Sequence, residues 1–173
     1  MEIDRLMQWW FAGNHSDVGG SNAETESRLS DIALQWMIEQ AIVIPNGLKI
    51  GPVVIHGDKM PGTGDLGEPL WLFPAADGVQ HCEIAAMRDT LDSLAERIPP
   101  LRRFVAGRNW EEKVRHIEHD APVHPTVKER FRIDLVVQCA GWGPYRPKAL
   151  ERHDEFRNYY PPPAHAPEPL NRP

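Results

Sequence analysis

One short apolar and aromatic run, Leu6 to Ala12, constrains the fold of this 173-residue chain more than any other segment. The run reads Leu-Met-Gln-Trp-Trp-Phe-Ala and is closed by the turn dipeptide Gly13-Asn14. Its length, its aromatic side chains and the turn after it predict a buried strand. A lone strand leaves its backbone hydrogen-bonding groups unpaired and its two faces uncovered. After this strand we expect mainly helices and loops. We therefore expect the chain to be the last part of a larger domain.

Three later segments have the spacing of amphipathic helices. The first runs from around Ser30 to Ile42, with Ser30 as the expected N-cap and Asp31 at the positive end of the helix. The second is expected from about Glu83 to Arg97, where apolar residues keep the 3.6-residue period. The third is expected from Pro125 to about Ile133, with proline at the first helical position. The side chains that this third helix should turn inward are Val127, Phe131 and Leu135.

The remaining segments are rich in glycine and proline. Short apolar pieces at Val53–Ile55 and at 70–73 fit either brief strands or packed loop, and the pattern does not decide between them. The chain has 17 prolines, about twice the ordinary usage, and several of them lie in the tail after Tyr160. We expect residues 161–173 to be a proline-rich, disordered tail that follows a domain over residues 1–160.

Charge and composition exclude several classes of protein. Nineteen Lys and Arg against 25 Asp and Glu give a net charge of -6, which argues against a dedicated nucleic-acid binder. No apolar run approaches the roughly 18 to 20 residues that a membrane span needs. The first residues, Met1 to Arg5, are too polar to open a secretory signal. We expect a cytoplasmic protein, with export by a route that needs no signal peptide left open, and we expect no cofactor.

Two cysteines occur, Cys82 and Cys139, far apart in the sequence and without Cys-x-x-Cys spacing. This pattern predicts neither a disulfide framework nor a cysteine zinc site, and it is typical of a protein from a reducing compartment.

The segment after the expected strand carries the best candidate for chemistry. Residues 15–21 are small, polar and glycine-rich, so we expect a loop there, and reactive groups of open α/β sheets lie in such loops. His15 can act as a general base in this position, and the alternative is a histidine that caps or lines a turn. Asp17 is expected to fix the loop through backbone hydrogen bonds. The other candidate residues of the site loop are Gly13, Asn14, Ser16, Gly19 and Gly20.

Two further clusters of residues could bind a ligand, but each also has an ordinary structural explanation. One is a histidine-rich group with partly helical spacing: His116, His119, Asp120 and His124. Pro122 and Pro125 interrupt that segment, so we predict no metal site there. The other is a basic stretch that contains Arg102, Arg103 and Arg108. We favour a solvated surface for it, and the alternative is contact with lipid headgroups or phosphate.

Longer blocks of the sequence resemble a known family. Residues 10–21, WFAGNHSDVGGS, and residues 26–37, ESRLSDIALQWM, are similar to a bacterial and fungal α/β-hydrolase family that was long filed as domain of unknown function 2235. That family includes the catalytic domain of type VI secretion phospholipase effectors. The resemblance extends over about residues 6–160, with further blocks at 77–81 (DGVQH), 88–91 (RDTL), 124–131 (HPTVKERF) and 145–150 (YRPKAL).

The resemblance implies an α/β protein, the C-terminal part of an α/β-hydrolase fold, here mostly helices and loops with one or a few short strands. It implies that His15 is the histidine of a serine hydrolase triad, which follows the serine and the acid in chain order. The family's serine lies in a Gly-x-Ser-x-Gly elbow, and none of the five serines here has that context: Ser16, Ser21, Ser27, Ser30 and Ser93. We expect the nucleophile and the acid to belong upstream of Met1.

Two interpretations of function follow. The first is a fragment of an esterase or phospholipase that is inactive alone, with an ester or lipid substrate and the missing N-terminal half as its partner. The second is a non-catalytic assembly module that docks onto a separately encoded N-terminal half through the apolar strand edge from Trp9 to Phe11. A metal-dependent hydrolase that uses the region of His116 is a third possibility.

Overall fold

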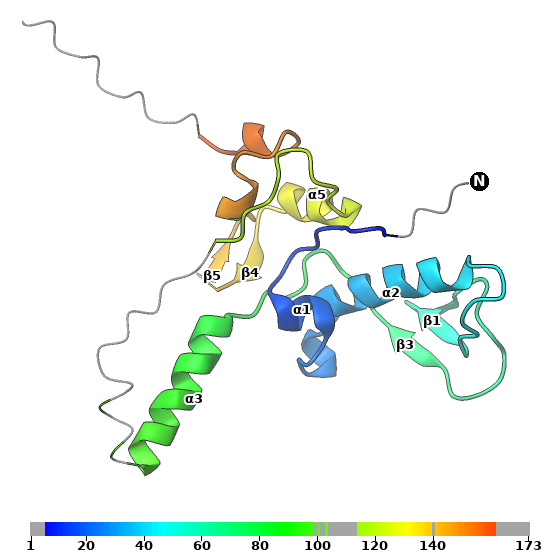
Figure 1. The fold of residues 1–173 in the computed structure, drawn as a ribbon, viewed down its shortest axis with the longest axis horizontal. Coiled ribbons are helices and arrows are strands. Elements are labelled where there is room, and N and C mark those ends of the chain that lie inside the picture. Colours follow the sequence, from blue (N-terminus) through cyan, green and yellow to red (C-terminus); the bar gives the residue numbers. More distant parts are fainter. Residues whose placement is uncertain (1–5, 99, 101–102, 104–113, 140, 162–173) are drawn as a thin grey trace, which may run out of the picture. The chain divides into compact units, whose positions relative to one another are not determined.

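The structure is a computed structural model, and it describes residues 6–98, 100, 103, 114–139 and 141–161, apart from the side chains of 83–87 (Figure 1). The chain divides into two compact units, residues 1–113 with 122–145, and residues 114–121 with 146–173. The expected disorder of the tail falls on residues that, apart from Pro161, lie outside the described ones. In the part of the chain that the structure describes, no helix has the length and apolar character needed to cross a lipid bilayer.

The apolar run at the start of the first unit is extended but largely exposed. Trp10 forms an isolated parallel bridge with Val123, in which the Trp10 N–H donates to Pro122 O at 2.9 Å. The His124 N–H in turn donates to Trp10 O at 2.9 Å. Leu6 is 72% exposed, whereas Ala12 is buried. The prediction of a buried strand is therefore wrong for the first half of the run, because a single bridge covers one residue of it.

A short helix, α1 (His15–Gly19), stands where the sequence predicted a loop. The glycines and polar residues of this segment suggested irregular backbone, but Asn14 and Asp17 form a reciprocal capping box that closes one helical turn. A single 3₁₀ turn, η1 (Glu24–Glu26), follows it.

Helix α2 (Arg28–Ile42) confirms the first predicted helix, with one correction at its start. Ser27 occupies the N-cap position, and Ser30, the expected N-cap, lies within the first turn and donates its hydroxyl to Ser27 O at 2.8 Å. The helix begins earlier because residues 24–26 already turn and lead straight into it. Leu29, Ile32 and Ala33 of the predicted apolar face are buried. Met37, which the same period placed on that face, is 61% exposed, and Ile38 is buried in its place.

A small sheet packs against the second half of α2 (Figure 1). It has the order β2-β1-β3 and is built from β1 (Val53–Ile55), β2 (Asp58–Lys59) and β3 (Leu70–Leu72). Strand β1 pairs antiparallel with β2 and parallel with β3. The two apolar pieces that the sequence left open are thus strands. Their buried residues Val53 and Leu72 form one cluster with Ile38 of α2 and with Met60, which follows β2.

Helix α5 (Pro125–Arg132) and a hairpin complete the first unit. The hairpin pairs β4 (Val136–Gln138) with β5 (Gly141–Gly143) and was not predicted from the sequence. Val127 and Phe131 are buried as expected, but Leu135 is 57% exposed. That part of the prediction is wrong because the backbone turns extended at Ile133, which places Val136 of β4 in the interior instead.

Helix α3 (Glu83–Arg97) has the predicted bounds, and the residue before it makes an unexpected bond. Cys82 and Cys139 are joined by a disulfide, with their Cα atoms 4.6 Å apart. The expectation that neither cysteine is bridged is therefore wrong in this structure. The Gln80 N–H donates to Val137 O at 3.1 Å, so the fold brings residues 80–82 beside β4 although 57 residues separate the two cysteines.

The second unit is small and holds two 3₁₀ turns, η3 (Lys148–Leu150) and η4 (Arg157–Tyr159). His153 is 4% exposed, and its Nε2 lies 2.9 Å from Ala121 O, while its ring contacts Phe156. The Tyr160 hydroxyl donates to Pro147 O at 2.6 Å. The side chains of His153 and Tyr160 therefore join parts of this unit that are distant in sequence.

Candidate functional site

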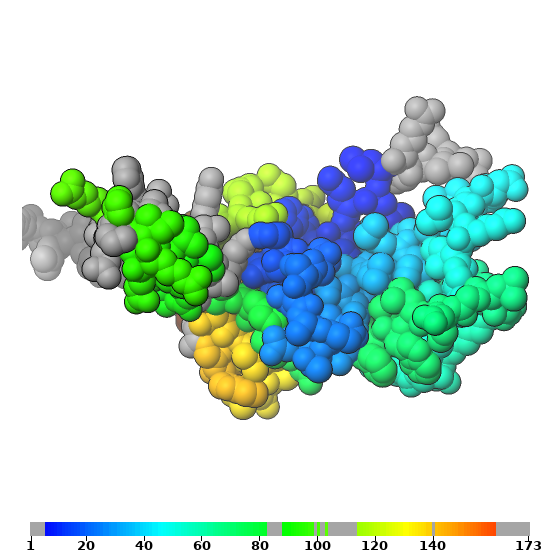
Figure 2. All heavy atoms as spheres, turned by 90° about the horizontal axis from the view of Figure 1, so that it is seen from below, coloured from blue at the N-terminus to red at the C-terminus, as the bar shows by residue number. Residues whose placement is uncertain are grey.

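His15 is the first residue of α1 and is exposed (Figure 2 shows the blue α1 region at the molecular surface). The residue before it, Asn14, accepts a hydrogen bond at Oδ1 from the Asp17 N–H at 2.9 Å. Asp17 Oδ2 in return accepts the Asn14 N–H at 3.1 Å. These reciprocal bonds fix the backbone on both sides of His15, so the site turn (residues 13–20) presents the imidazole from a rigid support.

The glycines on either side of this turn have separate roles. Gly13 has a φ of 112°, and a Cβ built there would lie 2.5 Å from Asp17 Cβ, so both the conformation and the space require glycine. Gly20 has a φ of 77° and ends α1, where its N–H donates to Ser16 O at 3.0 Å. Gly19 lies in α1 itself, and a Cβ added there would meet nothing within 4 Å.

Asp17 is the anchor of the turn and is 1% exposed. Besides Asn14 N–H, its carboxylate accepts the Asn22 Nδ2 donor at 3.1 Å and the His81 N–H at 3.2 Å. Its Oδ1 also lies 2.7 Å from Nδ1 of the His81 ring. A buried carboxylate that accepts this many hydrogen bonds holds α1 against the segment that contains His81.

His81 joins three parts of the site that are distant in sequence. Its Nδ1 faces Asp17, its Nε2 lies 2.9 Å from Oε2 of Glu26, and its carbonyl oxygen accepts Asn14 Nδ2 at 3.1 Å. Partial burial works to lower the pKa of His81, but the hydrogen bonds and charges of Glu26 and Asp17 outweigh it and raise the pKa above 6.5. The two carboxylates therefore make the imidazolium form of this ring more favourable than it is for a histidine in water.

Arg130 of α5 supports the segment that leads to His81. Its side chain is fully buried and donates from Nη1 to Ala76 O at 2.5 Å and to Gly78 O at 2.7 Å. Its Nη2 donates to Val137 O at 3.2 Å, and its guanidinium lies 4.9 Å from the ring centroid of Tyr145. Burial lowers the pKa of Arg130 and raises the pKa of the Tyr145 phenol to about 12.

Two serine hydroxyls at the start of α2 donate to backbone carbonyls. Ser27 Oγ donates to Glu24 O at 2.9 Å, and Ser30 Oγ donates to Ser27 O. Ser93 lies exposed on α3. The structure thus gathers the predicted site residues into one capped turn, and the neighbours that it adds are histidine, arginine, amide and carboxylate groups.

Sequence reasoning missed His81, Glu26, Asn22 and Arg130. The one available signal for His81 was its place in the 77–81 block of the family resemblance, since no local pattern pairs it with Asp17 across 64 residues. Arg130 lies in the 124–131 block of the same resemblance, but no local pattern marked it as a buried residue, because an arginine on a helix is usually an exposed charge.

The histidine-rich group divides between the two units. In the second unit, His119 Nδ1 lies 3.1 Å from Asp154 Oδ2, and this bond is the main cause that raises the pKa of His119. In the first unit, His124 caps α5 by accepting Thr126 N–H and stacks on Phe11 at 4.7 Å, and burial lowers its pKa. No group of three or more His, Cys, Asp or Glu that could hold a metal ion occurs among the described residues.

The basic stretch is mostly outside the described residues. Arg102 and Arg108 lie outside them, and Arg103 is exposed.

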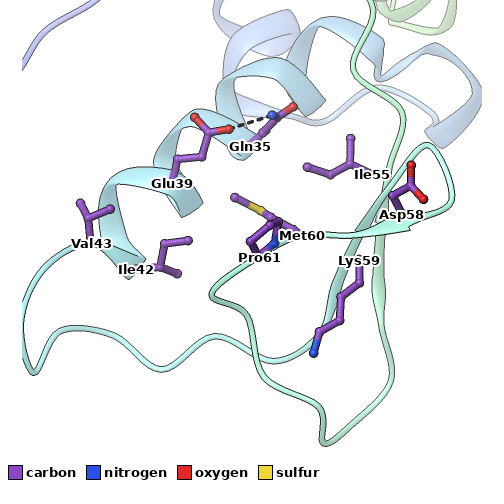
Figure 3. Close-up of a pocket in the computed structure, with 9 residues that line it drawn as sticks. All are labelled: Gln35, Glu39, Ile42, Val43, Ile55, Asp58, Lys59, Met60 and Pro61. Atoms are coloured by element: carbon purple, nitrogen blue, oxygen red, sulfur yellow. Dashed lines mark hydrogen bonds between the residues drawn. The ribbon is translucent and has the colours of Figure 1, made fainter.

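A separate groove of about 480 Å³ lies between α2 and the small sheet (Figure 3). Its apolar lining comes from both elements, and polar side chains share the lining, among them Gln35, whose Nε2 donates to Glu39 at 2.8 Å. The lining residues are Gln35, Glu39, Ile42, Val43, Ile55, Asp58, Lys59, Met60 and Pro61. Neither His15 nor His81 lines it, so the groove is distinct from the site turn.

Comparison with known proteins gives two matches. Residues 1–40 match the family model of the type VI secretion system phospholipase effector Tle1-like catalytic domain. Over 141 residues the chain is 32% identical to the uncharacterized protein YEL023C of Saccharomyces cerevisiae, which covers 78% of this chain and 19% of the yeast protein. The chain therefore spans about a fifth of the length of that relative. No solved structure matches. The family match includes the whole site turn and Glu26, and it ends before His81.

Proposed function

We propose that this chain is part of an α/β-hydrolase that cleaves carboxylic esters, phospholipids among them, and that His15 is its general base. The observation that carries the proposal is the match of residues 1–40 to a phospholipase effector-like catalytic domain, because that range contains the complete site turn. The exposed position of His15 at the start of a capped helix supports the same role.

In such an enzyme the His15 ring would take the proton from a serine hydroxyl and return it to the leaving alcohol. A general base must lie within about 2.6–3.2 Å of the proton donor's heavy atom, so a support that fixes its backbone matters for the rate. The capping box of Asn14 and Asp17 is a support of this kind.

The proposed nucleophile and acid come from outside these 173 residues. None of the five serines stands in a Gly-x-Ser-x-Gly elbow, and the hydroxyls of Ser27 and Ser30 donate to backbone carbonyls. The chain alone should therefore have little or no hydrolytic activity, because the proposed nucleophile is not among its residues.

The test compares the purified chain with a co-expressed pair. The partner is a polypeptide that carries a Gly-x-Ser-x-Gly elbow, taken from the reading frame immediately upstream, and the substrates are p-nitrophenyl butyrate and phosphatidylcholine vesicles. We expect turnover from the pair and none from the chain alone. In the pair, His15→Ala should abolish turnover and His116→Ala, an exposed histidine of the second unit, should not.

Two results would contradict this proposal. Clear turnover by the lone chain that His15→Ala removes would show that the active site is complete without a partner. If the pair with His15→Ala still turned over substrate, His15 would not be the general base.

A second candidate function is that of a non-catalytic assembly module. The observation in its favour is the exposed apolar start of the first unit, where Leu6, Met7 and Trp9 are 72%, 52% and 36% exposed. Among the described residues, the backbone of Trp9 and Phe11 makes no backbone hydrogen bond, so one edge of this segment is open to a strand of a partner. A stable complex of the co-expressed pair without turnover on either substrate would favour this candidate.

A further inference from the structure

Asn14 and Asp17, which lie on either side of His15 in the site turn, are both bonded to His81. Asn14, just before His15, donates its side-chain amide to His81 O at 3.1 Å. Asp17, two residues after it, accepts both the backbone N–H and the ring Nδ1 of His81. The position of the His15 backbone therefore depends on a residue 64 positions beyond Asp17.

His81 itself stands on a well-supported segment. Arg130 binds the carbonyls of Ala76 and Gly78, the Gln80 N–H donates to Val137 O, and the disulfide fixes Cys82 directly after His81. The turn is thus held by a side chain whose own backbone is tied down on both sides.

The bonds of the His81 ring require a particular protonation state. Ionised carboxylates accept hydrogen bonds and cannot donate them, and a neutral imidazole has one N–H group. Nδ1 and Nε2 face Asp17 at 2.7 Å and Glu26 at 2.9 Å, so both bonds form together when the ring carries two protons. The imidazolium thereby links Asp17 of α1 to Glu26 of η1. Asp17 also accepts a hydrogen bond from Asn22, which lies between these two elements.

We propose that His81, in its imidazolium form, is the positioning residue of the site turn. Loss of one ring proton releases Glu26 and turns the charge-assisted bond to Asp17 into a weaker neutral one, which loosens the turn that carries His15. As a statement about regulation of the hydrolase site, the inference rests on the proposed function. Neutral His81 keeps its proton on Nδ1, where buried Asp17 accepts it, and the Nε2 lone pair then faces the Glu26 carboxylate. Glu26 has a side chain that is 53% exposed and can move into solvent.

The charged groups around this ring come from several elements. Asp17 of α1 and Glu26 of η1 act directly on His81, and both favour its charged form. From α5, Arg130 interacts with Asp17 and with Asp77, which lies on the same segment as His81. Since the folded state raises the pKa of His81 above 6.5, the stability from the ring's second proton is fully present below about pH 6.5. It is lost as the pH rises through the raised value.

The central variant is His81→Asn. The asparagine amide can donate to Asp17 as Nδ1 does, but it cannot reach Glu26 and does not titrate, so it imitates neutral His81 at every pH. We expect the wild-type melting temperature to exceed that of H81N most below about pH 6.5, and the difference to shrink toward zero as the pH rises through the folded-state pKa. His116→Asn is the control, and its difference from the wild type should stay constant with pH.

Amide hydrogen exchange reports on the turn itself. After correction for intrinsic rates, protection of residues 14–20 in the wild type should fall with a midpoint at the His81 pKa, measured by NMR titration of the ring. In H81N the protection should not depend on pH. If His81 had only a structural role, H81N would lose the same amount of protection relative to the wild type at every pH.

A second variant keeps the inference testable if H81N does not fold. Glu26→Gln removes one charge beside Nε2, so the pKa of His81 should fall toward 6.5, and the exchange midpoint should fall with it. A His81 ring in the wild type that titrates at or below about 6.5 would overturn the inference, as would a turn whose protection ignores that titration. These measurements need no turnover, so they stand apart from the hydrolysis test of the proposed function.

Discussion

The Asp17 carboxylate, 1% exposed, decides how His15 is presented. It closes the capping box with Asn14, and it leaves no room for a side chain at Gly13. The sequence indicated Gly13, His15 and Asp17 because all of them lie in one local pattern. His81 stayed hidden because its partnership with Asp17 arises from the tertiary fold, which no local spacing reports.

At this scale we predict that Gly13→Ala destabilises the protein by at least about 1 kcal/mol, because φ is 112° and the new Cβ would lie 2.5 Å from Asp17 Cβ. Gly19→Ala is the matched control in the same turn, where a Cβ meets nothing within 4 Å. It should leave the free energy of unfolding unchanged or raise it by up to about 1 kcal/mol. Urea unfolding followed by circular dichroism measures both. Equal effects of the two substitutions would show that the turn is not packed as described.

Among the elements, the helices α2, α3 and α5 were predictable because each has a long apolar period or a clear first residue. Strand β2 and the β4–β5 hairpin were not, because strands of two or three residues carry too little pattern to be recognised. Helix α1 was missed although its capping pair, Asn14 and Asp17, is visible in the sequence, because the glycines around it outweighed that signal. The membership of these elements in an α/β-hydrolase fold stays a prediction.

Helix α5 acts on the site through Arg130, and this gives a prediction at the element scale. Arg130→Met leaves the carbonyls of Ala76, Gly78 and Val137 without their buried donor, so the free energy of unfolding should fall by about 2–3 kcal/mol. Arg132→Met on the same helix is the control and should change it by less than about 0.5 kcal/mol, because Arg132 is exposed. Chemical denaturation of the two variants is the measurement, and an Arg130 variant as stable as the Arg132 variant would contradict this role.

On the scale of the whole molecule, the chain aligns with 19% of its yeast relative and displays apolar side chains at Leu6, Met7 and Trp9. Large exposed apolar groups that lie together are typical of an interaction surface. If the proposed hydrolase role is correct, the lack of a Gly-x-Ser-x-Gly elbow means that the nucleophile would come from another polypeptide segment. A partner that binds the open edge of the segment around Trp9 would bind directly before the site turn that carries His15.

The most direct test of the proposed role of His15 is the rate at which a fluorophosphonate probe labels the elbow serine of the co-expressed partner. A serine activated by a histidine base reacts with such a probe, and a serine without its base reacts slowly. We predict labelling of the partner when this chain is present, and a fall of at least about 10²-fold in the labelling rate with His15→Ala but not with His116→Ala. Labelling that is equally fast without this chain, or with His15→Ala, would contradict the account.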